Sequence, residues 1–271
     1  VYKRQLLLPA PQLTSGVIMV LLVLAQGTKL ALVEGCIAAA VLLTVSLIFG
    51  VSIPSIVTLM AGTWVPVLLL AIMLLGSRSL TLAVQVAVIA AAVALVGFYA
   101  VVADPIAFWQ PYMDTMAEVV RQNNLQLNLE LLTAEVMTVS AVLAFWMLYT
   151  AGLLLGYAMY KSLPRETGDF GRFRDLNLGR VIAVMMALIS LLALAVNATW
   201  LQNLAFMLFV VFWIQGLSIV HWLHSQGTIP LAVLIAVYAL LPFLQVLLMT
   251  ALAVFGFTDA WFDFRRRMKK A

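Results

Sequence analysis

The sequence has very little charge. Only 10% of its 271 residues are Asp, Glu, Lys or Arg, whereas 65% are hydrophobic. An ordinary globular domain carries about 25% charged residues and about half apolar residues. Polar side chains are too few to cover a large water-soluble core, which excludes that class of protein. The net charge of +4 does not indicate a nucleic-acid partner, because the basic residues stand at the ends of hydrophobic runs.

Cysteine and recognisable catalytic motifs are also scarce. Cys36 is the single cysteine, so a disulfide within the chain and a cysteine metal cluster are both excluded, and we expect a small buried residue there. No dinucleotide-binding, P-loop or zinc-protease string occurs. His221 and His224 are three residues apart, but no third metal ligand stands nearby. The sequence therefore predicts no metal, no cofactor and no enzymatic activity.

Long hydrophobic runs dominate the chain. Runs of about 20 residues match a hydrocarbon core about 30 Å thick, and backbone groups in lipid must be satisfied within the segment. We therefore predict an all-α fold: one integral membrane domain over residues 1–271, a polytopic transmembrane helix bundle. Its segments, about eight in number, are expected near residues 11–26, 30–49, 55–75, 80–103, 131–160, 181–198, 203–224 and 229–257.

Three polar stretches separate or follow these segments. Residues 104–130 are acidic and contain apolar side chains at helical spacing, which is typical of an amphipathic helix at a membrane interface. Residues 161–180 form the longest basic loop, and residues 259–271 form a basic tail. Lysine and arginine favour the cytoplasmic side. We therefore expect the loop inside the cell and residues 104–130 outside.

The two ends of the chain raise separate questions. Residues 1–5 resemble translated sequencing adapter and are expected to be non-native. Counting crossings back from the basic loop places the amino end outside, so we expect one further helix before it. Counting forward places the basic tail outside, against its charge. We expect the last segment, about 29 residues long, to break at Pro242, although a non-spanning segment elsewhere would also resolve the conflict.

Several stretches resemble YybS-like bacterial membrane proteins, a family of unknown function. They are Gly168-Asp169-Phe170-Gly171-Arg172-Phe173-Arg174-Asp175-Leu176-Asn177-Leu178-Gly179-Arg180, the run from Gln215 to His221, and the run from Gly256 to Arg267. The resemblance implies a multi-pass protein of the bacterial cytoplasmic membrane. It also implies a distant likeness to the substrate-binding components of energy-coupling-factor transporters, which is an analogy of fold alone.

Polar groups inside or beside the apolar runs are the candidate functional residues, because each is costly in lipid. The candidate solute-binding residues are Asn197, Trp200, Gln202, Asn203, Gln215 and Gln245. Helix capping and hydrogen bonds between helices are the alternative roles for the amides. Glu34 and Glu135 are candidate ion-coupling residues, and a local ion pair is the alternative for each of them.

The basic residues of the loop and tail are candidate cytoplasmic contacts: Arg172, Arg174, Arg180, Arg265, Arg266 and Arg267. Besides setting orientation, they could contact anionic lipid or a cytoplasmic or membrane protein partner. Two functions remain open. A solute-binding or transport component requires an outer pocket lined by Asn197, Trp200 and Asn203. A non-catalytic scaffold or assembly factor requires a partner that depends on the basic residues.

Overall fold

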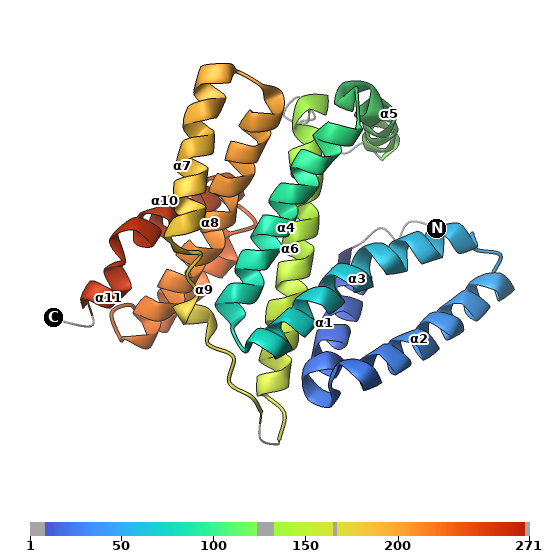
Figure 1. Cartoon of the computed structure of the whole chain (residues 1–271), viewed down its shortest axis with the longest axis horizontal. Coiled ribbons are helices and arrows are strands. Elements are labelled where there is room, and N and C mark those ends of the chain that lie inside the picture. Colours follow the sequence, from blue (N-terminus) through green and yellow to red (C-terminus); the bar gives the residue numbers. More distant parts are fainter. Residues whose placement is uncertain (1–8, 124–132, 165–166, 269–271) are drawn as a thin grey trace. The chain divides into compact units, whose positions relative to one another are not determined.

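The computed structural model describes residues 9–123, 133–164 and 167–268, and almost all of them are helical (Figure 1). This confirms the all-α polytopic helix bundle. Residues 1–5 lie outside the described residues. Seven described helices are long and apolar enough to cross a membrane: α2 (Thr28–Ile48), α3 (Ile53–Ser77), α4 (Leu80–Val101), α6 (Ala134–Lys161), α7 (Gly179–Val196), α8 (Thr199–Ser225) and α10 (Gln245–Phe262). The other described elements are α1 (Pro9–Gln26), α5 (Pro105–Gln122), the 3₁₀ turn η3 (Phe173–Asp175), α9 (Leu231–Leu240) and α11 (Phe264–Met268).

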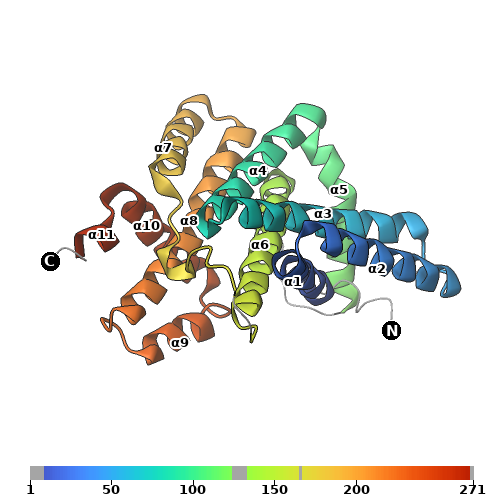
Figure 2. The same cartoon turned by 60° about the horizontal axis from the view of Figure 1, so that its bottom comes forward.

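The chain forms two compact units, which we describe separately. The first consists of residues 1–87 and 145–173, and the second of residues 88–144 and 174–271. In the first unit α1 packs on α2 and α3, and Figure 2 shows these three helices. Gly156 of α6 lets α1 approach closely, because a Cβ at this position would lie 2.5 Å from Cβ of Val20. Gly152, one turn earlier, faces the backbone of Gly16. These two glycines of α6 therefore permit close packing against α1.

The basic loop is anchored to the first unit by aromatic residues of α6. The hydroxyl of Tyr157 accepts a hydrogen bond from the amide of Phe170 and donates one to the carbonyl of Gly171, both at 2.9 Å. The Phe170 ring stacks on Tyr157 and Tyr160. The carbonyl of Phe170 accepts a bond from the amide of Leu80 at the start of α4. These contacts hold the first half of the loop against the ends of two helices.

Helix α8 is the core of the second unit. Its most apolar stretch is 56% buried, more than that of any other candidate span, because α7 and α10 both pack against it. Glycines bring α8 and α10 into backbone contact. A methyl group on Gly216 would overlap the carbonyl oxygen of Leu252, and one on Gly256 would overlap that of Phe212. Such a close crossing is possible only where both helices lack a side chain at the contact.

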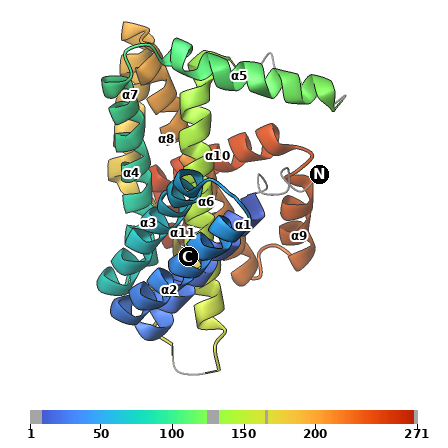
Figure 3. The ribbon, with the colours of Figure 1, turned by 90° about the vertical axis from the view of Figure 1, so that its right-hand side faces the viewer.

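The last hydrophobic segment is broken at the residue that the sequence indicated. Helix α9 ends at Leu240, residues 241–244 form a turn that contains Pro242, and α10 begins at Gln245. Proline has no amide hydrogen, so the helix cannot continue through it without loss. Ten residues at 1.5 Å each make α9 about 15 Å long, half the thickness of the hydrocarbon core. Figure 3 shows α9 and α10 meeting at a sharp corner.

The acidic stretch forms a separate surface helix, as predicted. Asp104 caps α5 by accepting a hydrogen bond from the amide of Ala107 at 3.0 Å. None of the residues of α5 is buried, and the helix runs across the direction of α7 and α8 (Figure 3). The indole of Trp109 donates to the hydroxyl of Thr138, which fixes α5 to the start of α6. Residues 124–130 of the predicted stretch lie outside the described residues.

The expectation for Cys36 was wrong. This residue is exposed on α2, a helix whose apolar stretch is only 17% buried. In a protein surrounded by lipid, an apolar side chain is stable on the outer surface as well as in the core, so hydrophobicity alone does not predict burial.

Candidate functional site

A pocket in the second unit is lined by two of the predicted residues, Glu135 and Trp200. It has a volume of about 300 Å³ and is lined by residues at the end of α4, the start of α5 and the first turns of α6 and α8: Tyr99, Ala103, Asp104, Pro105, Ile106, Glu135, Thr199 and Trp200. We call this cavity the outer pocket, because the charge pattern of the sequence predicts that these helix ends lie outside the cell. Its volume lies at the lower end of the range found for small-molecule sites.

Asn203 builds the wall of the outer pocket. It is 5% exposed, and its Nδ2 atom donates to the hydroxyl of Tyr99 at 2.6 Å and to the carbonyl of Glu135 at 2.7 Å. Its amide group thus joins three helices, α4, α6 and α8. Both hydrogens of Nδ2 are used in these bonds. Asn203 therefore positions the pocket residues and does not itself line the cavity.

The charge of the outer pocket is negative. Asp104 and Glu135 are its only ionisable carboxyl groups among the described lining residues, and no lysine, arginine or histidine lines it. Tyr99 and Trp200 supply aromatic surface beside them. Carboxylates and aromatic faces both attract cations. The arrangement can therefore hold a small solute that carries a positive charge.

The other predicted outer residues have a local role. Asn197 ends α7 in the left-handed conformation, with φ at 50°, and its side chain accepts a hydrogen bond from Gln202 at 2.7 Å. Neither residue lines the outer pocket. Their hydrogen bond at the turn between α7 and α8 fits the alternative role of helix capping for both residues. Gln245 is exposed at the first position of α10, Glu34 is half-buried on α2, and neither residue lines the outer pocket.

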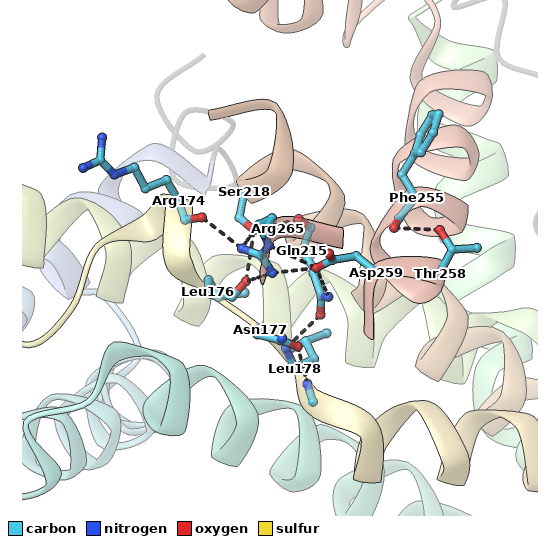
Figure 4. A network of polar contacts seen from close by, with 11 residues as sticks. Arg174, Leu176, Asn177, Leu178, Gln215, Ser218, Phe255, Thr258, Asp259 and Arg265 are labelled. Atoms are coloured by element: carbon cyan, nitrogen blue, oxygen red, sulfur yellow. Dashed lines mark hydrogen bonds and ion pairs between the residues drawn. The ribbon is translucent and has the colours of Figure 1, made fainter. Parts of the chain in front are cut away.

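A second polar site lies where the loop, α8 and the tail meet, and we call it the buried clasp (Figure 4). Asp259 is completely buried and its Oδ2 atom accepts hydrogen bonds from Nη2 of Arg265 at 2.7 Å and from Nε2 of Gln215 at 3.0 Å. Arg265 is 7% exposed and also donates to the carbonyls of Arg174 and Leu176, each at 2.9 Å.

Gln215 completes the buried clasp from the side of α8. Its Oε1 atom accepts a hydrogen bond from the amide of Leu178 at 2.8 Å, directly before α7 begins. Ser218, one turn later, donates to the carbonyls of Leu176 and Gln215. The clasp therefore fastens the second half of the basic loop to α8 and to the tail. The start of the tail and the second half of the loop are therefore in direct contact.

Two predicted residues thus differ from expectation. Gln215 was a candidate solute ligand, but it is fully buried and bonded to protein groups at both ends of its amide. Arg265 was a candidate cytoplasmic contact, but its guanidinium is committed to Asp259 and to two loop carbonyls. Burial of an arginine is stable only with such pairing. Arg172, Arg180, Arg266 and Arg267 are exposed, and Arg174 is half-buried.

The histidine pair is also engaged within the protein. Nε2 of His221 lies 2.8 Å from the hydroxyl of Tyr238, and Nδ1 of His224 lies 3.2 Å from the carbonyl of Ile229. Among the described residues, no group of three or more His, Cys, Asp or Glu side chains could hold a metal ion. These contacts tie the end of α8 to α9.

Sequence reasoning missed Asp259, Ser218, Tyr99 and Asp104 as members of these sites. A signal existed for Asp259, because a carboxylate at the end of an apolar run needs a partner. No signal was available for the pairing itself. Asp263 adopts the left-handed conformation, with φ at 50°, and this turn brings Arg265 back toward a residue six positions earlier.

A comparison with models of protein families shows to which family the chain belongs. The family model described as "Predicted membrane protein (DUF2232)" matches residues 110–260, more than half of the chain. The chain belongs to this family of predicted membrane proteins. The match covers Glu135 and Trp200 of the outer pocket and Gln215 and Asp259 of the buried clasp, whereas Arg265 lies beyond it. No curated protein and no solved structure was found to match the chain.

Membership of the DUF2232 family agrees with the multi-pass helical fold and with contact between the helices and a lipid bilayer. The family description names no substrate, partner or reaction. Function has to be inferred from the two polar sites.

Proposed function

We propose that the protein is a small-solute binding or transport component of the bacterial cytoplasmic membrane, and that the outer pocket binds the solute. The observation that carries this proposal is the pocket of about 300 Å³ between the ends of α4, α5, α6 and α8. Two residues selected from the sequence, Trp200 and Glu135, line it, and a third, Asn203, holds its wall together.

The chemistry of the lining narrows the class of solute. Two carboxylates beside aromatic rings favour an organic ammonium ion over an anion or a neutral sugar, since a cation gains from both types of group. We base the solute-binding role on this lining, and the likeness of fold to the binding components of energy-coupling-factor transporters that the sequence suggests stays an expectation. We further propose that the protein is not itself an enzyme.

A binding screen tests this proposal. The purified protein in lipid nanodiscs is incubated with a panel of small cations, anions and neutral solutes, and binding is followed by isothermal calorimetry. We expect a cationic solute to bind, and Glu135→Gln and Trp200→Leu to weaken its affinity by at least about tenfold, which corresponds to about 1.4 kcal/mol. Glu34→Gln is the matched control, because Glu34 is a half-buried carboxylate of α2 that does not line the pocket.

The panel also gives the outcome that would refute the proposal. If no cation binds, or if Glu34→Gln weakens binding as much as Glu135→Gln, the outer pocket is not a solute site.

The alternative is a scaffold or assembly factor, and one observation favours it. Arg172, Arg180, Arg266 and Arg267 remain exposed, and the buried clasp holds the second half of the loop and the tail together within the second unit. Crosslinking followed by mass spectrometry tests this role. A partner that is captured by the native chain and lost from the combined Arg172→Ala and Arg267→Ala variant would support it, and a partner captured equally by both chains would not.

A further inference from the structure

An apolar groove of the second unit lies next to the outer pocket, and the proposed function does not account for it. It has a volume of about 420 Å³ and is lined by α4, α7 and α8, and Figure 1 shows α8 between the other two helices. The most buried residues of its lining are Val88, Ile182, Leu204 and Leu208. Every described residue of the lining is apolar or glycine. We call it the chain groove.

The chain groove and the outer pocket lie along the same faces of two helices. On α4, Val96 lines the groove and Tyr99, three residues later, lines the pocket. On α8, Trp200 lines the pocket and Leu204, four residues later, lines the groove. Residues three or four apart are neighbours on one helical face, about 6 Å or less along the axis. The two cavities therefore adjoin, and one elongated ligand can occupy both.

The chain groove opens onto the lipid-facing surface of the bundle. Ile89 and Val93 at its α4 edge are 48% and 65% exposed, and Met185 at its α7 edge is 38% exposed. The groove extends from Val88 to Gly97 on α4, about 14 Å at the helical rise of 1.5 Å per residue. This length fits within a hydrocarbon core about 30 Å thick. An aliphatic chain can therefore enter the groove from the bilayer without crossing a polar surface.

The outer pocket selects the head group that such a chain carries. Asp104 and Glu135 line the pocket, and no lysine, arginine or histidine stands among the described lining residues of either cavity. A phosphate at this level would be repelled by both carboxylates, which argues against an ordinary phospholipid. A terminal ammonium is attracted by the carboxylates and by the aromatic rings of Tyr99 and Trp200. The charge of the pocket and the apolar groove together fit a cationic amphiphile.

We propose that the solute of the outer pocket is an aliphatic ammonium ion, with its head beside Asp104 and Glu135 and its chain in the chain groove. This inference rests on the proposed function, because it assigns a class of solute to the same pocket. The ligand then reaches the protein through the bilayer, head group at the membrane surface and chain in the hydrocarbon, which is the orientation that an amphiphile already has in lipid.

Calorimetric titration of the full chain in lipid nanodiscs tests the inference with two probes, ethylammonium and octylammonium. Ethylammonium fills only the outer pocket, whereas octylammonium also reaches the chain groove. After subtraction of the signal from empty nanodiscs, we expect octylammonium to bind at least about tenfold more tightly, since each buried methylene strengthens binding several-fold. Octyl sulfate has the same chain and a negative head, and it should not compete.

Gly97 allows the chain groove to be filled without a clash. It lines the groove at the end nearest the outer pocket, and a Cβ at this position meets no atom within 4 Å. Leucine is also a better helix former than glycine. In Gly97→Leu we expect the affinity for octylammonium to fall to that for ethylammonium. Gly62→Leu, at a helical glycine of α3 with equally open surroundings, is the matched control and should keep the tenfold difference.

A photolabel locates the chain without relying on affinity. Octylammonium with a diazirine on its last carbon is bound and illuminated, and the labelled residues are identified by mass spectrometry. We expect labels on residues of the chain groove such as Ile89 and Met185, and their loss in excess octylammonium. Labels that fall equally on exposed residues of α2 such as Ile37 would overturn the inference, because they would show general contact with the lipid-facing surface only.

The outcomes separate this inference from the proposed function. If ethylammonium binds and depends on Glu135, but octylammonium binds no more tightly, the chain groove is not part of the site and the proposed function stands. Equal losses in Gly97→Leu and Gly62→Leu would lead to the same conclusion. If uncharged 1-octanol displaces octylammonium at equal concentration, the groove accepts any chain and the ammonium assignment is wrong. If neither ammonium ion binds the native protein, the proposed function fails and this inference fails with it.

Discussion

Removal of the Arg265 side chain should destabilise the protein more than any other change to the basic tail. In Arg265→Met, the carboxylate of Asp259 remains completely buried without its cation, and the carbonyls of Arg174 and Leu176 each lose a donor. Breaking a buried ion pair by removing one partner costs about 3–5 kcal/mol. We expect the free energy of unfolding to fall by that amount, since methionine keeps much of the side-chain volume but none of the hydrogen bonds.

Arg266→Met is the matched control, because Arg266 is the next residue, is exposed and forms no ion pair within 4.0 Å in the described part of the chain. Surface substitutions of this kind usually change stability by no more than about 0.5 kcal/mol. A second variant that combines Arg265→Met with Asp259→Leu removes both charges and should recover most of the loss, because an apolar pair can replace a buried ion pair.

Unfolding in mixed micelles by titration with a denaturing detergent, followed by tryptophan fluorescence, measures these differences. The native protein and the three variants are compared under one set of conditions, so the comparison rests on differences in midpoint and slope. If Arg265→Met were as stable as Arg266→Met, the ion pair would be solvated and the buried clasp would not hold the tail.

Two further predictions concern the helix crossing and the loop. Gly216→Ala and Gly256→Ala should each destabilise the protein by about 1–3 kcal/mol or prevent folding, because the new methyl overlaps backbone of the facing helix. Gly62→Ala, at a helical glycine with open space around it, should leave the thermal unfolding temperature unchanged or raise it, and equal losses at all three positions would contradict the crossing. Tyr157→Phe removes the two hydrogen bonds that hold the loop, each worth about 1 kcal/mol, and should speed tryptic cleavage at Arg172, whereas the same change at exposed Tyr112 should not. Equal cleavage rates in the two variants would show that the loop is held by other contacts.

The hydrophobic runs were sufficient to predict the fold class and most helix positions. Each run was long, and a run in lipid has no alternative to a helix, so composition and length decide the secondary structure. The break at Pro242 could also be predicted, because a proline in an overlong segment coincided with a conflict in the charge pattern. The structure confirms it, with α9 ending at Leu240 and α10 beginning at Gln245.

The contacts between helices could not be predicted, because they depend on how distant segments meet. Gly216 and Gly256 are 40 positions apart, and nothing in either helix alone shows that they form one crossing. Gln215 was interpreted as a solute ligand because an amide in an apolar run is costly, yet the same cost is met equally well by Asp259 and Leu178. A single sequence shows that a polar side chain in an apolar run needs a hydrogen-bond partner, but it does not show which residue that partner is.

Only some of the residues at the outer pocket were selected from the sequence, because its lining comes from four helices that are distant in the chain. Asn203 and Trp200 were selected as groups near a predicted outer turn, and Glu135 was selected as an ion-coupling candidate. Trp200 and Glu135 line the pocket, and Asn203 lies behind its wall. Tyr99 and Asp104 were not selected, because they belong to α4 and to the cap of α5, which approach α8 only in the folded protein. Asn197 and Gln202 were selected by proximity to the same turn but serve the turn itself.

Cysteine labelling from one side of the membrane tests most directly whether the tail and the basic loop share a side. In a Cys36→Ala background, single cysteines are introduced by Arg172→Cys, Arg267→Cys and Asp114→Cys, and cells are treated with a membrane-impermeant maleimide. We predict labelling at position 114 only, with positions 172 and 267 labelled after the membrane is permeabilised. Labelling of position 267 from outside while position 172 stays protected would contradict both the turn at Pro242 and the buried clasp.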